Sequence, residues 1–200
     1  MVLFLIFFLI FKQQDDKILK NGNTSNSGSI DEIESNLCQI SYYQATIEVT
    51  VQSNKNTNTY TLKQEYEKQG EQEIAKQEVL LPENLKGVQI IKKQNQLEVK
   101  NTTLNLSKIY EKYQDMTKND LWLDDFLEEY QESVSKQRSE EENVVIFQID
   151  PNTNPYQKQK RLYVSKETGK PQKLVVEDMN KKNKVYILYK EIEMRSVKEK

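Results

Sequence analysis

The sequence predicts a mainly β (α+β) protein in which one strongly curved antiparallel sheet, a half-barrel, wraps over a few helices. Alternating runs of apolar and polar residues recur from Tyr42 to Met194, with turn residues between them at a spacing of roughly 8–12 residues. Two stretches instead show the period of an amphipathic helix. Because an open sheet this long must cover its apolar face, we expect those helices to lie within its curve.

The composition favours a binding protein over an enzyme. The chain has 200 residues, no histidine and one cysteine, and 29 Lys+Arg against 31 Asp+Glu give a formal charge of −2. Without histidine, serine–histidine, cysteine–histidine and histidine–metal sites cannot form. Interleaved lysine and glutamate do not make the basic face that nucleic-acid binding needs. We therefore expect no catalytic residue, metal site, cofactor or nucleic-acid partner.

The first 28 residues divide into two segments ahead of a single domain at 29–195. Residues 1–12 contain an apolar run from Val2 to Phe11, which has the length of a signal-peptide core and is short for a transmembrane helix. No basic residue precedes this run and no small-residue cleavage site follows it, so cleavage and anchoring both stay open. Residues 13–28 carry no periodicity and predict a flexible tether. We expect an extracytoplasmic protein with a signal-like or anchoring segment at 1–12.

The domain is predicted to begin with a helix. Ser29 is a good N-cap, and Glu32 completes a capping box before an apolar stripe formed by Ile30, Ile33, Leu37 and Ile40. Period-two alternation then predicts strands at 43–51, 60–66, 73–81, 85–91 and 96–100, with a weaker piece at 104–109. We expect these strands to form consecutive hairpins.

A second helix is predicted at 119–130, and the rest of the chain is again hairpins. Leu123, Phe126, Leu127 and Tyr130 fall at helical spacing, and acidic residues occupy the remaining positions. Residues 135–143 are expected to form a charged loop. Strands follow at 144–150, 161–165, 173–177 and 185–194.

A half-barrel leaves a concavity between its sheet and its helices, and the inward-facing residues are our candidate apolar site. This set comprises Ala45, Ile47, Val49, Val51, Tyr60, Leu62, Ile90, Leu97, Val99, Trp122 and Phe126. Such residues either line a cavity that holds acyl chains or simply fill a core, and the pattern is the same for both.

Two further features have ordinary structural explanations. The carboxylates Asp124, Asp125, Glu128 and Glu129 cluster on the second helix, but a charged helix face is normally the solvated side. A glycosidase-like pair or a hard-metal site is a formal alternative, although the calcium-loop pattern is absent. Cys38 has no partner for an intrachain disulfide, and we expect it to act as a small buried hydrophobe.

Several segments together resemble a known superfamily. Residues 162–178, with the turn Thr168-Gly169-Lys170-Pro171, and residues 185–193 resemble the C-terminal hairpins of the LolA-like lipoprotein-carrier superfamily. Residues 43–51, 58–60, 82–87 and 121–130 resemble more closely the germination lipoprotein (GerS) group of spore-forming bacteria. The resemblance covers about Ser29 to Met194.

The resemblance implies a function as well as a half-barrel fold. It implies a non-catalytic accessory protein, attached to the outer side of the cytoplasmic membrane or the spore envelope. It also implies a role in spore cortex peptidoglycan remodelling or germination, through an N-acetylmuramoyl-L-alanine amidase partner. The alternative is a lipid or lipoprotein carrier that binds acyl chains in the concavity. This chain departs from a lipoprotein because Leu9-Ile10-Phe11-Lys12 has lysine where the Leu-x-x-Cys lipobox has cysteine, and Cys38 lies too far downstream to substitute.

Overall fold

The structure is a computed structural model that describes residues 29–93, 96–111, 120–150, 158–178 and 182–196. In these residues eleven strands form one antiparallel sheet in the order β6-β5-β4-β3-β2-β1-β11-β10-β9-β8-β7. The strands are β1 Ile40–Gln52, β2 Thr57–Gln69, β3 Gln72–Leu81, β4 Val88–Lys93, β5 Gln96–Asn101, β6 Leu106–Glu111, β7 Lys136–Glu140, β8 Val144–Ile149, β9 Gln159–Ser165, β10 Pro171–Glu177 and β11 Lys184–Ser196. The predicted segments 1–12 and 13–28 lie outside the described residues.

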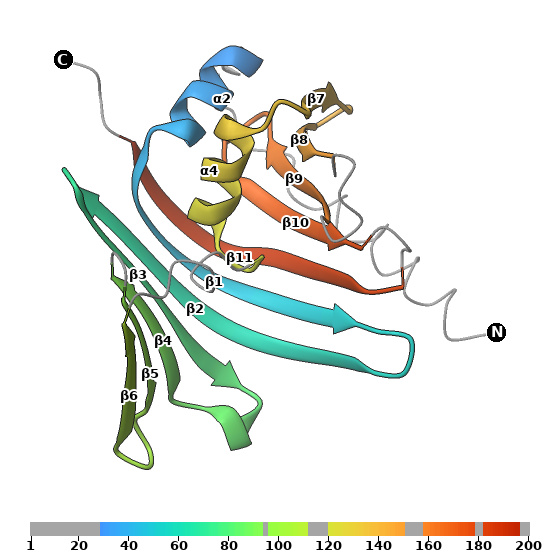
Figure 1. Cartoon of the computed structure of the whole chain (residues 1–200). Helices are drawn as coiled ribbons and strands as arrows, with labels where there is room; N and C mark the ends of the chain where they lie inside the picture. The colour runs from blue at the N-terminus through green and yellow to red at the C-terminus, as the bar shows by residue number, and fades with distance from the viewer. Residues whose placement is uncertain (1–28, 94–95, 112–119, 151–157, 179–181, 197–200) are drawn as a thin grey trace, which may run out of the picture.

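The sheet is curved and unclosed, and two helices lie on its concave side. Figure 1 shows α2 (Ile30–Cys38) and α4 (Leu123–Glu132) over the half of the sheet that contains β1 and β8–β11, while β4–β6 curve away from both helices. A short 3-10 helix, η1 (Glu83–Leu85), joins β3 to β4. The predicted fold class, a curved antiparallel sheet wrapped over a few helices, is confirmed. In the described residues, no helix is long and apolar enough to cross a membrane.

Helix α2 begins at the predicted residue. The Ser29 hydroxyl accepts a hydrogen bond from the backbone N–H of Glu32 at 3.2 Å, which satisfies one of the free donors of the first turn. Ile33 and Leu37 are buried beneath the helix. The helix ends at Cys38, and the chain passes into β1 at Ile40.

The core lies between the concave face and the two helices. Alternation along β1 buries Tyr43, Ala45, Ile47 and Val49, each at most 2% exposed. Central strands β1 and β11 shift register between Thr46 and Ile47, and such a bulge bends a strand and increases its twist. The bend helps to make the concavity in which α4 lies.

The structure corrects one expectation about the chain and sharpens another. The predicted charged loop at 135–143 contains β7, an edge strand whose residues Lys136–Glu140 are all exposed. No alternation marks this strand because neither face is buried, and charged residues protect a free sheet edge. The weak strand predicted at 104–109 is the opposite edge, β6, which begins two residues later at Leu106.

Phe126 is expected to be a major contributor to the attachment of α4 to the sheet. Its side chain is 1% exposed and stacks with Tyr130, with ring centroids 6.1 Å apart. The substitution Phe126→Ala should lower the free energy of unfolding by about 3–5 kcal/mol, because it removes buried apolar surface and leaves a cavity. Urea denaturation will measure this loss as a lower midpoint at unchanged slope.

Val134→Ala is the matched control for this measurement. Val134 is 92% exposed, so its truncation should change stability by no more than about 0.5 kcal/mol. Equal effects of the two substitutions would show that α4 does not depend on this packing.

Candidate functional site

The structure places the predicted apolar residues in three environments. Six of them are buried in the core: Ala45, Ile47, Val49, Leu62, Trp122 and Phe126. Val51, Tyr60 and Ile90 are partly buried and pack against that core. Leu97 and Val99 are half-buried on the inner face of β5, next to Lys92 and Ile90 of β4. The predicted set therefore includes both packed interior and a partly uncovered strip of the inner face.

The sequence pattern indicated that the acidic residues of α4 lie on the solvated side of the helix. This expectation is wrong for two of them. Asp124 is 9% exposed and Asp125 is 6% exposed, whereas Glu128 is exposed. Buried carboxylates require a compensating charge or hydrogen bonds. Both are supplied by the sheet.

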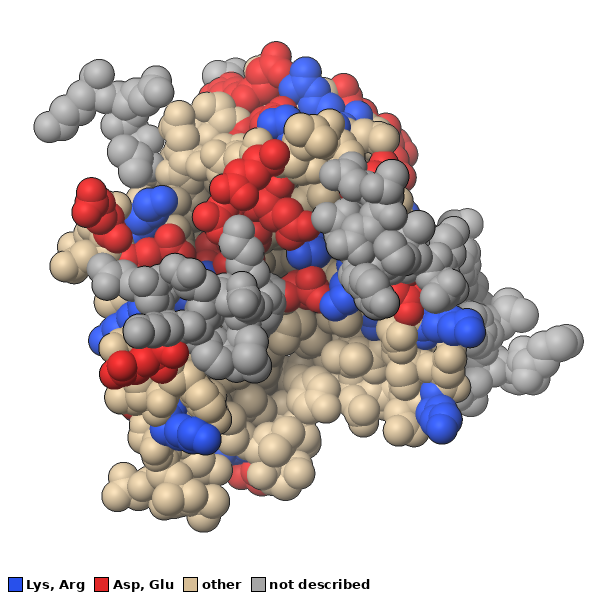
Figure 2. Space-filling view, viewed as in Figure 1, with Lys and Arg blue, Asp and Glu red and all other residues tan. Residues whose placement is uncertain are grey.

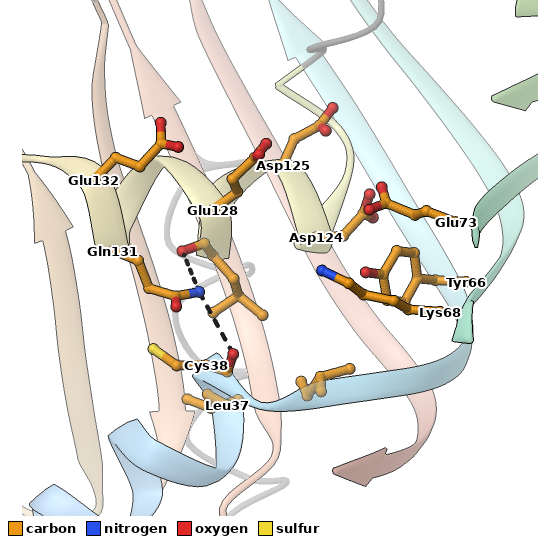
Figure 3. A pocket seen from close by; sticks show the side chains of 12 residues that line it. Leu37, Cys38, Tyr66, Lys68, Glu73, Asp124, Asp125, Glu128, Gln131 and Glu132 are labelled. Atoms are coloured by element: carbon orange, nitrogen blue, oxygen red, sulfur yellow. Dashed lines mark hydrogen bonds between the residues drawn. The ribbon is translucent and has the colours of Figure 1, made fainter. Parts of the chain in front are cut away.

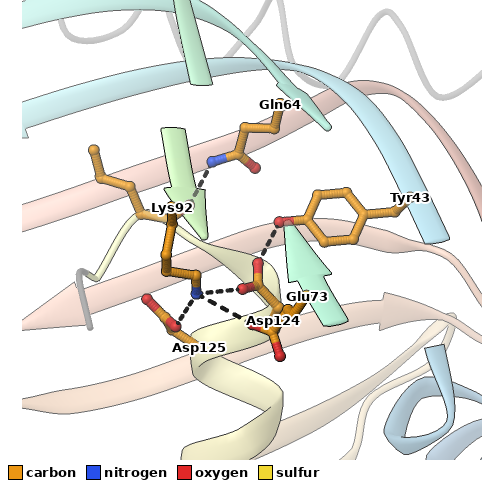
Figure 4. Close-up of polar contacts among 7 residues, drawn as sticks. Tyr43, Gln64, Glu73, Lys92, Asp124 and Asp125 are labelled. Atoms are coloured by element: carbon orange, nitrogen blue, oxygen red, sulfur yellow. Dashed lines mark hydrogen bonds and ion pairs between the residues drawn. The ribbon is translucent and has the colours of Figure 1, made fainter. Parts of the chain in front are cut away.

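Lys92 lies at the centre of a buried ion cluster. Its Nζ atom is 2.7 Å from Asp124 Oδ2, 2.7 Å from Asp125 Oδ1 and 3.6 Å from Glu73 Oε1. The Tyr43 hydroxyl donates a hydrogen bond to the second oxygen of Asp124 at 2.6 Å (Figure 4). Asp124 therefore receives a hydrogen bond on each of its oxygens, and the first turn of α4 is fastened to both β1 and β4.

The sheet register explains how a lysine fits inside the concavity. Inner-face residues run across neighbouring strands from Tyr43 through Tyr66 and Ala75 to Lys92. Ala75 is fully buried and small, so the Lys92 side chain has room to lie beside it. The ammonium also lies 5.6 Å from the ring centroid of Trp122, within the range of a cation–π interaction. Asp124 and Asp125 in turn occupy the first turn of α4, where the helix dipole favours negative charge.

The cluster shifts the pKa values of its members in the directions that strengthen it. Burial lowers the pKa of Lys92. The charges of Asp124 and Asp125 and the hydrogen bonds to them raise this pKa by a larger amount, so the pKa of Lys92 lies above its ordinary value. Burial, followed by the charge of Asp124 and the hydrogen bond to it, raises the pKa of Tyr43 well above its ordinary value. Lys92 is therefore charged and Tyr43 is neutral over the physiological range.

A pocket of about 240 Å³ opens next to this cluster, between α2, α4 and the start of β3 (Figure 3). Its apolar part comes from Leu37, Ile40 and Leu127. Gln131 Nε2 donates to the carbonyl oxygens of Leu127 at 3.2 Å and Cys38 at 3.5 Å, which ties the two helices together at the pocket wall.

Cys38 lines this pocket as a free, partly buried thiol. Burial, together with the nearby charge of Glu34, raises the pKa of the Cys38 thiol against the opposing effect of Lys136. A thiol with a raised pKa is a poor nucleophile at neutral pH. The expectation that Cys38 is a small buried hydrophobe is therefore met only in part, because its side chain is partly buried and lines the pocket.

The polar wall of the pocket is acidic. Asp124, Asp125, Glu128 and Glu132 reach it from α4, and Glu73 reaches it from β3. Figure 2 shows acidic side chains gathered over this part of the molecule, around α4 and α2. In the part of the chain that the structure describes, no three Cys, Asp or Glu side chains come together as a metal-binding group.

Sequence reasoning missed the residues that surround these carboxylates, namely Tyr43, Tyr66, Glu73 and Lys92. One signal was available for Lys92. It follows Ile90 by two positions, so period-two alternation places it on the same inner face. A lysine at a buried strand position requires a carboxylate partner from elsewhere in the fold.

The comparisons with known proteins identify the family. The model of the family described as "Sporulation protein YdcC-like" matches residues 1–199. The chain belongs to this family. No curated protein matches the sequence.

Similar solved structures agree with the fold of this YdcC-like chain. An uncharacterized conserved protein from Thermus thermophilus is 14% identical, with a TM-score of 0.51 over 84% of this chain and 86% of that chain. The structure of the CwlD amidase from Clostridioides difficile in complex with the GerS lipoprotein gives a match of 21% identity and TM-score 0.46, over 91% and 99% of the two chains. A LolA superfamily protein from Nitrosomonas europaea matches at 9% identity and TM-score 0.43, over 86% and 96%. The match to the Thermus thermophilus protein supports the fold, and the family match agrees with the resemblance to proteins of spore-forming bacteria seen in the sequence.

Removal of Lys92 is expected to destabilise the YdcC-like domain strongly. Lys92→Met leaves Asp124 and Asp125 buried without their counter-charge, which should lower the free energy of unfolding by about 3–5 kcal/mol. The triple variant with Asp124→Asn and Asp125→Asn should recover much of this loss, because no uncompensated charge remains. Urea denaturation compares these variants with Lys76→Met, which removes a partly exposed ion pair and should change stability by no more than about 1 kcal/mol. Similar effects of Lys92→Met and Lys76→Met would contradict a structural role for the cluster.

The segment before α4 should make stability depend on pH through Asp120. Lys160 Nζ lies 3.0 Å from Asp120 Oδ1, and Lys158 pairs with the other oxygen. Burial raises the pKa of Asp120, but the charge of Lys160 and the hydrogen bonds from both lysines outweigh it, so the pKa is lowered. A lowered carboxylate pKa contributes stability above the unfolded value of about 3.9, and that contribution is lost as the pH falls through the folded value. Asp120→Asn should therefore be less stable than the native chain at pH 7, with a gap that closes below about pH 4.

Urea denaturation between pH 7 and pH 3 measures this gap. Glu83→Gln is the control, because the exposed pair of Glu83 with Lys86 should contribute little at any pH. A gap for Asp120→Asn that stays constant with pH would show that the ion pairs do not cause it.

Proposed function

We propose that this protein is a non-catalytic, extracytoplasmic accessory protein that acts in spore cortex peptidoglycan remodelling or germination by binding a cell-wall amidase. Membership of the YdcC-like sporulation protein family over residues 1–199 carries the proposal. The choice of an N-acetylmuramoyl-L-alanine amidase as partner comes from the sequence resemblance to the germination lipoprotein group.

The chemistry of the domain supports a binding role. The chain has no histidine, and the buried carboxylates Asp124 and Asp125 are held at 2.7 Å by Lys92. The Asp124 carboxylate is fixed in an ion pair and also accepts a hydrogen bond from the Tyr43 hydroxyl, so it is poorly suited to exchange protons with a substrate. The cluster therefore has the properties of a structural ion-pair network that holds α4 against the sheet.

The N-terminal sequence supports a location at the outer surface of the cytoplasmic membrane. The apolar run from Val2 to Phe11 directs or anchors the chain, and residues 13–28 connect it to a single domain at 29–195. Fully extended, the 16 residues of the 13–28 connection would reach about 53–58 Å, which would allow the domain to meet a membrane-bound partner in several orientations.

A lipid or lipoprotein carrier is the second candidate, and the partial exposure of the inner face of β5 and β6, within the described residues, favours it. Leu97 and Val99 are half-buried there, and Leu106, which alternation places on the same face, is 63% exposed. An acyl chain on this strip would gain about 0.8 kcal/mol for each buried methylene.

Native mass spectrometry of the full chain, extracted from the envelope of its host in mild detergent, tests the proposal. We expect a complex whose added mass equals that of an amidase. Purified full chain added to that amidase should also increase the rate of peptidoglycan hydrolysis. A lipid-sized adduct without a protein adduct would favour the carrier instead. An amidase that neither binds nor responds to the chain would refute the accessory role.

A further inference from the structure

The pocket beside the ion cluster contains the hydroxyl of a buried tyrosine without a hydrogen-bond partner. Tyr66 is 6% exposed, and Figure 3 shows its hydroxyl directed into the pocket. Its ring is fixed by stacking on Tyr43, with centroids 5.4 Å apart and an interplanar angle of 19°. In the part of the chain that the structure describes, nothing forms a hydrogen bond with this hydroxyl. The hydroxyl is held rigidly and opens to the pocket, so it can exchange a hydrogen bond with a ligand there.

The charges around this hydroxyl favour a cation. Five carboxylates line the pocket together with one ammonium group, that of Lys68, and Lys92 lies in the adjoining ion cluster. Glu73 lies only 3.6 Å from Lys92, and its side chain is 35% exposed, so its carboxylate remains accessible from the pocket. An electronegative cleft with low-dielectric walls concentrates cations and disfavours anions.

The size and the apolar part of the pocket narrow the class of cation. Its volume of about 240 Å³ corresponds to roughly eight liquid water molecules. That is room for one long side chain and not for a folded element. Leu37, Ile40 and Leu127 provide an apolar contact for methylene groups, while the carboxylates and the Tyr66 hydroxyl provide acceptors for several N–H donors. An arginine side chain has this combination of an aliphatic stem and a planar fork of five donors.

We propose that this pocket binds an arginine side chain of the partner protein, with the guanidinium between Glu73 and the Tyr66 hydroxyl and the stem against Leu37 and Leu127. The identity of that partner rests on the proposed function, whereas recognition of the guanidinium rests on the pocket itself. The ion cluster takes part as a positioning device, because it fixes Asp124 at the pocket wall and leaves Glu73 as the more exposed carboxylate.

Peptide binding to the full chain in mild detergent tests the guanidinium specificity directly. The probes are acetyl-Leu-Arg-Leu-amide and the same peptide with citrulline, which has nearly the same shape and no charge. We expect the arginine peptide to bind at least tenfold more tightly by isothermal titration calorimetry, and its affinity to fall as salt is raised. Equal binding of the two peptides, or no binding of either, would overturn the proposal.

Substitutions in the pocket provide a second test, because some of them should weaken binding of the arginine peptide and one should strengthen it. Tyr66→Phe keeps the ring stack and removes the hydroxyl, and Glu73→Gln removes the accessible charge. Each should weaken the arginine peptide about tenfold, as expected for loss of a hydrogen bond to a charged group. Lys68→Gln should strengthen binding, because it removes a like charge from the pocket.

Glu78→Gln is the matched control. Glu78 lies on the same strand as Glu73 but on the opposite face, where it accepts a hydrogen bond from Gln89. This substitution should leave peptide affinity unchanged. If Glu78→Gln lowered the affinity for the arginine peptide as much as Glu73→Gln, the effect would come from the net charge of the protein. That result would contradict a specific pocket.

The two proposals fail in distinguishable ways. If the amidase binds the native chain and the Tyr66→Phe and Glu73→Gln variants equally well, and the arginine peptide does not bind, the pocket inference is wrong and the accessory role stands. If the arginine peptide binds as described but the amidase does not, the pocket is correct and its partner is a different protein.

Discussion

The ion cluster around Lys92 determines how this fold closes its concave side. An open, curved sheet must cover its inner apolar face, and α4 is the helix that lies there. Its first turn carries Asp124 and Asp125 into the interior, where two uncompensated carboxylates would be strongly unfavourable. Lys92 supplies the counter-charge from β4, and Tyr43 completes the hydrogen bonds from β1. The position of the helix and the charge of the sheet are therefore mutually dependent.

The same cluster explains why an acidic pocket is tolerated beside a hydrophobic core. Tyr43 belongs to the cluster and to the core, and Tyr66 stacks on its ring at the pocket wall. Because the ring and the Asp124 carboxylate are both fixed, the pocket is preorganised. A preorganised site loses little conformational entropy when a ligand binds. This smaller entropic cost allows a small contact area to give measurable affinity.

The sequence was sufficient for the fold but only partly sufficient for the site. Alternation along β1 and the cap at Ser29 are local signals, and both predicted their elements correctly. The strand β7 escaped prediction because both of its faces are exposed, so no period appears. Asp124 and Asp125 look like a solvated helix face because their partner, Lys92, is more than thirty residues away in the chain. Alternation from Ile90 indicates that Lys92 faces inward, but only the register of β3 and β4 places it beside Ala75.

A division of roles within the concavity follows from this arrangement. Where α4 lies, residues such as Ile47 and Phe126 fill the core and present no surface to a partner. Apolar packing of that kind provides stability, whereas discrimination between partners depends on buried polar groups that are left unpaired when the wrong ligand binds. Tyr66 and Glu73 are polar groups at the edge of the covered region, where the Tyr66 hydroxyl faces the pocket and the Glu73 carboxylate is partly exposed beside Lys92. Specific recognition by this half-barrel is therefore expected at the acidic rim near α4, and the inner face of β5 and β6, where Lys108 lies opposite Val99, is suited to less selective contacts.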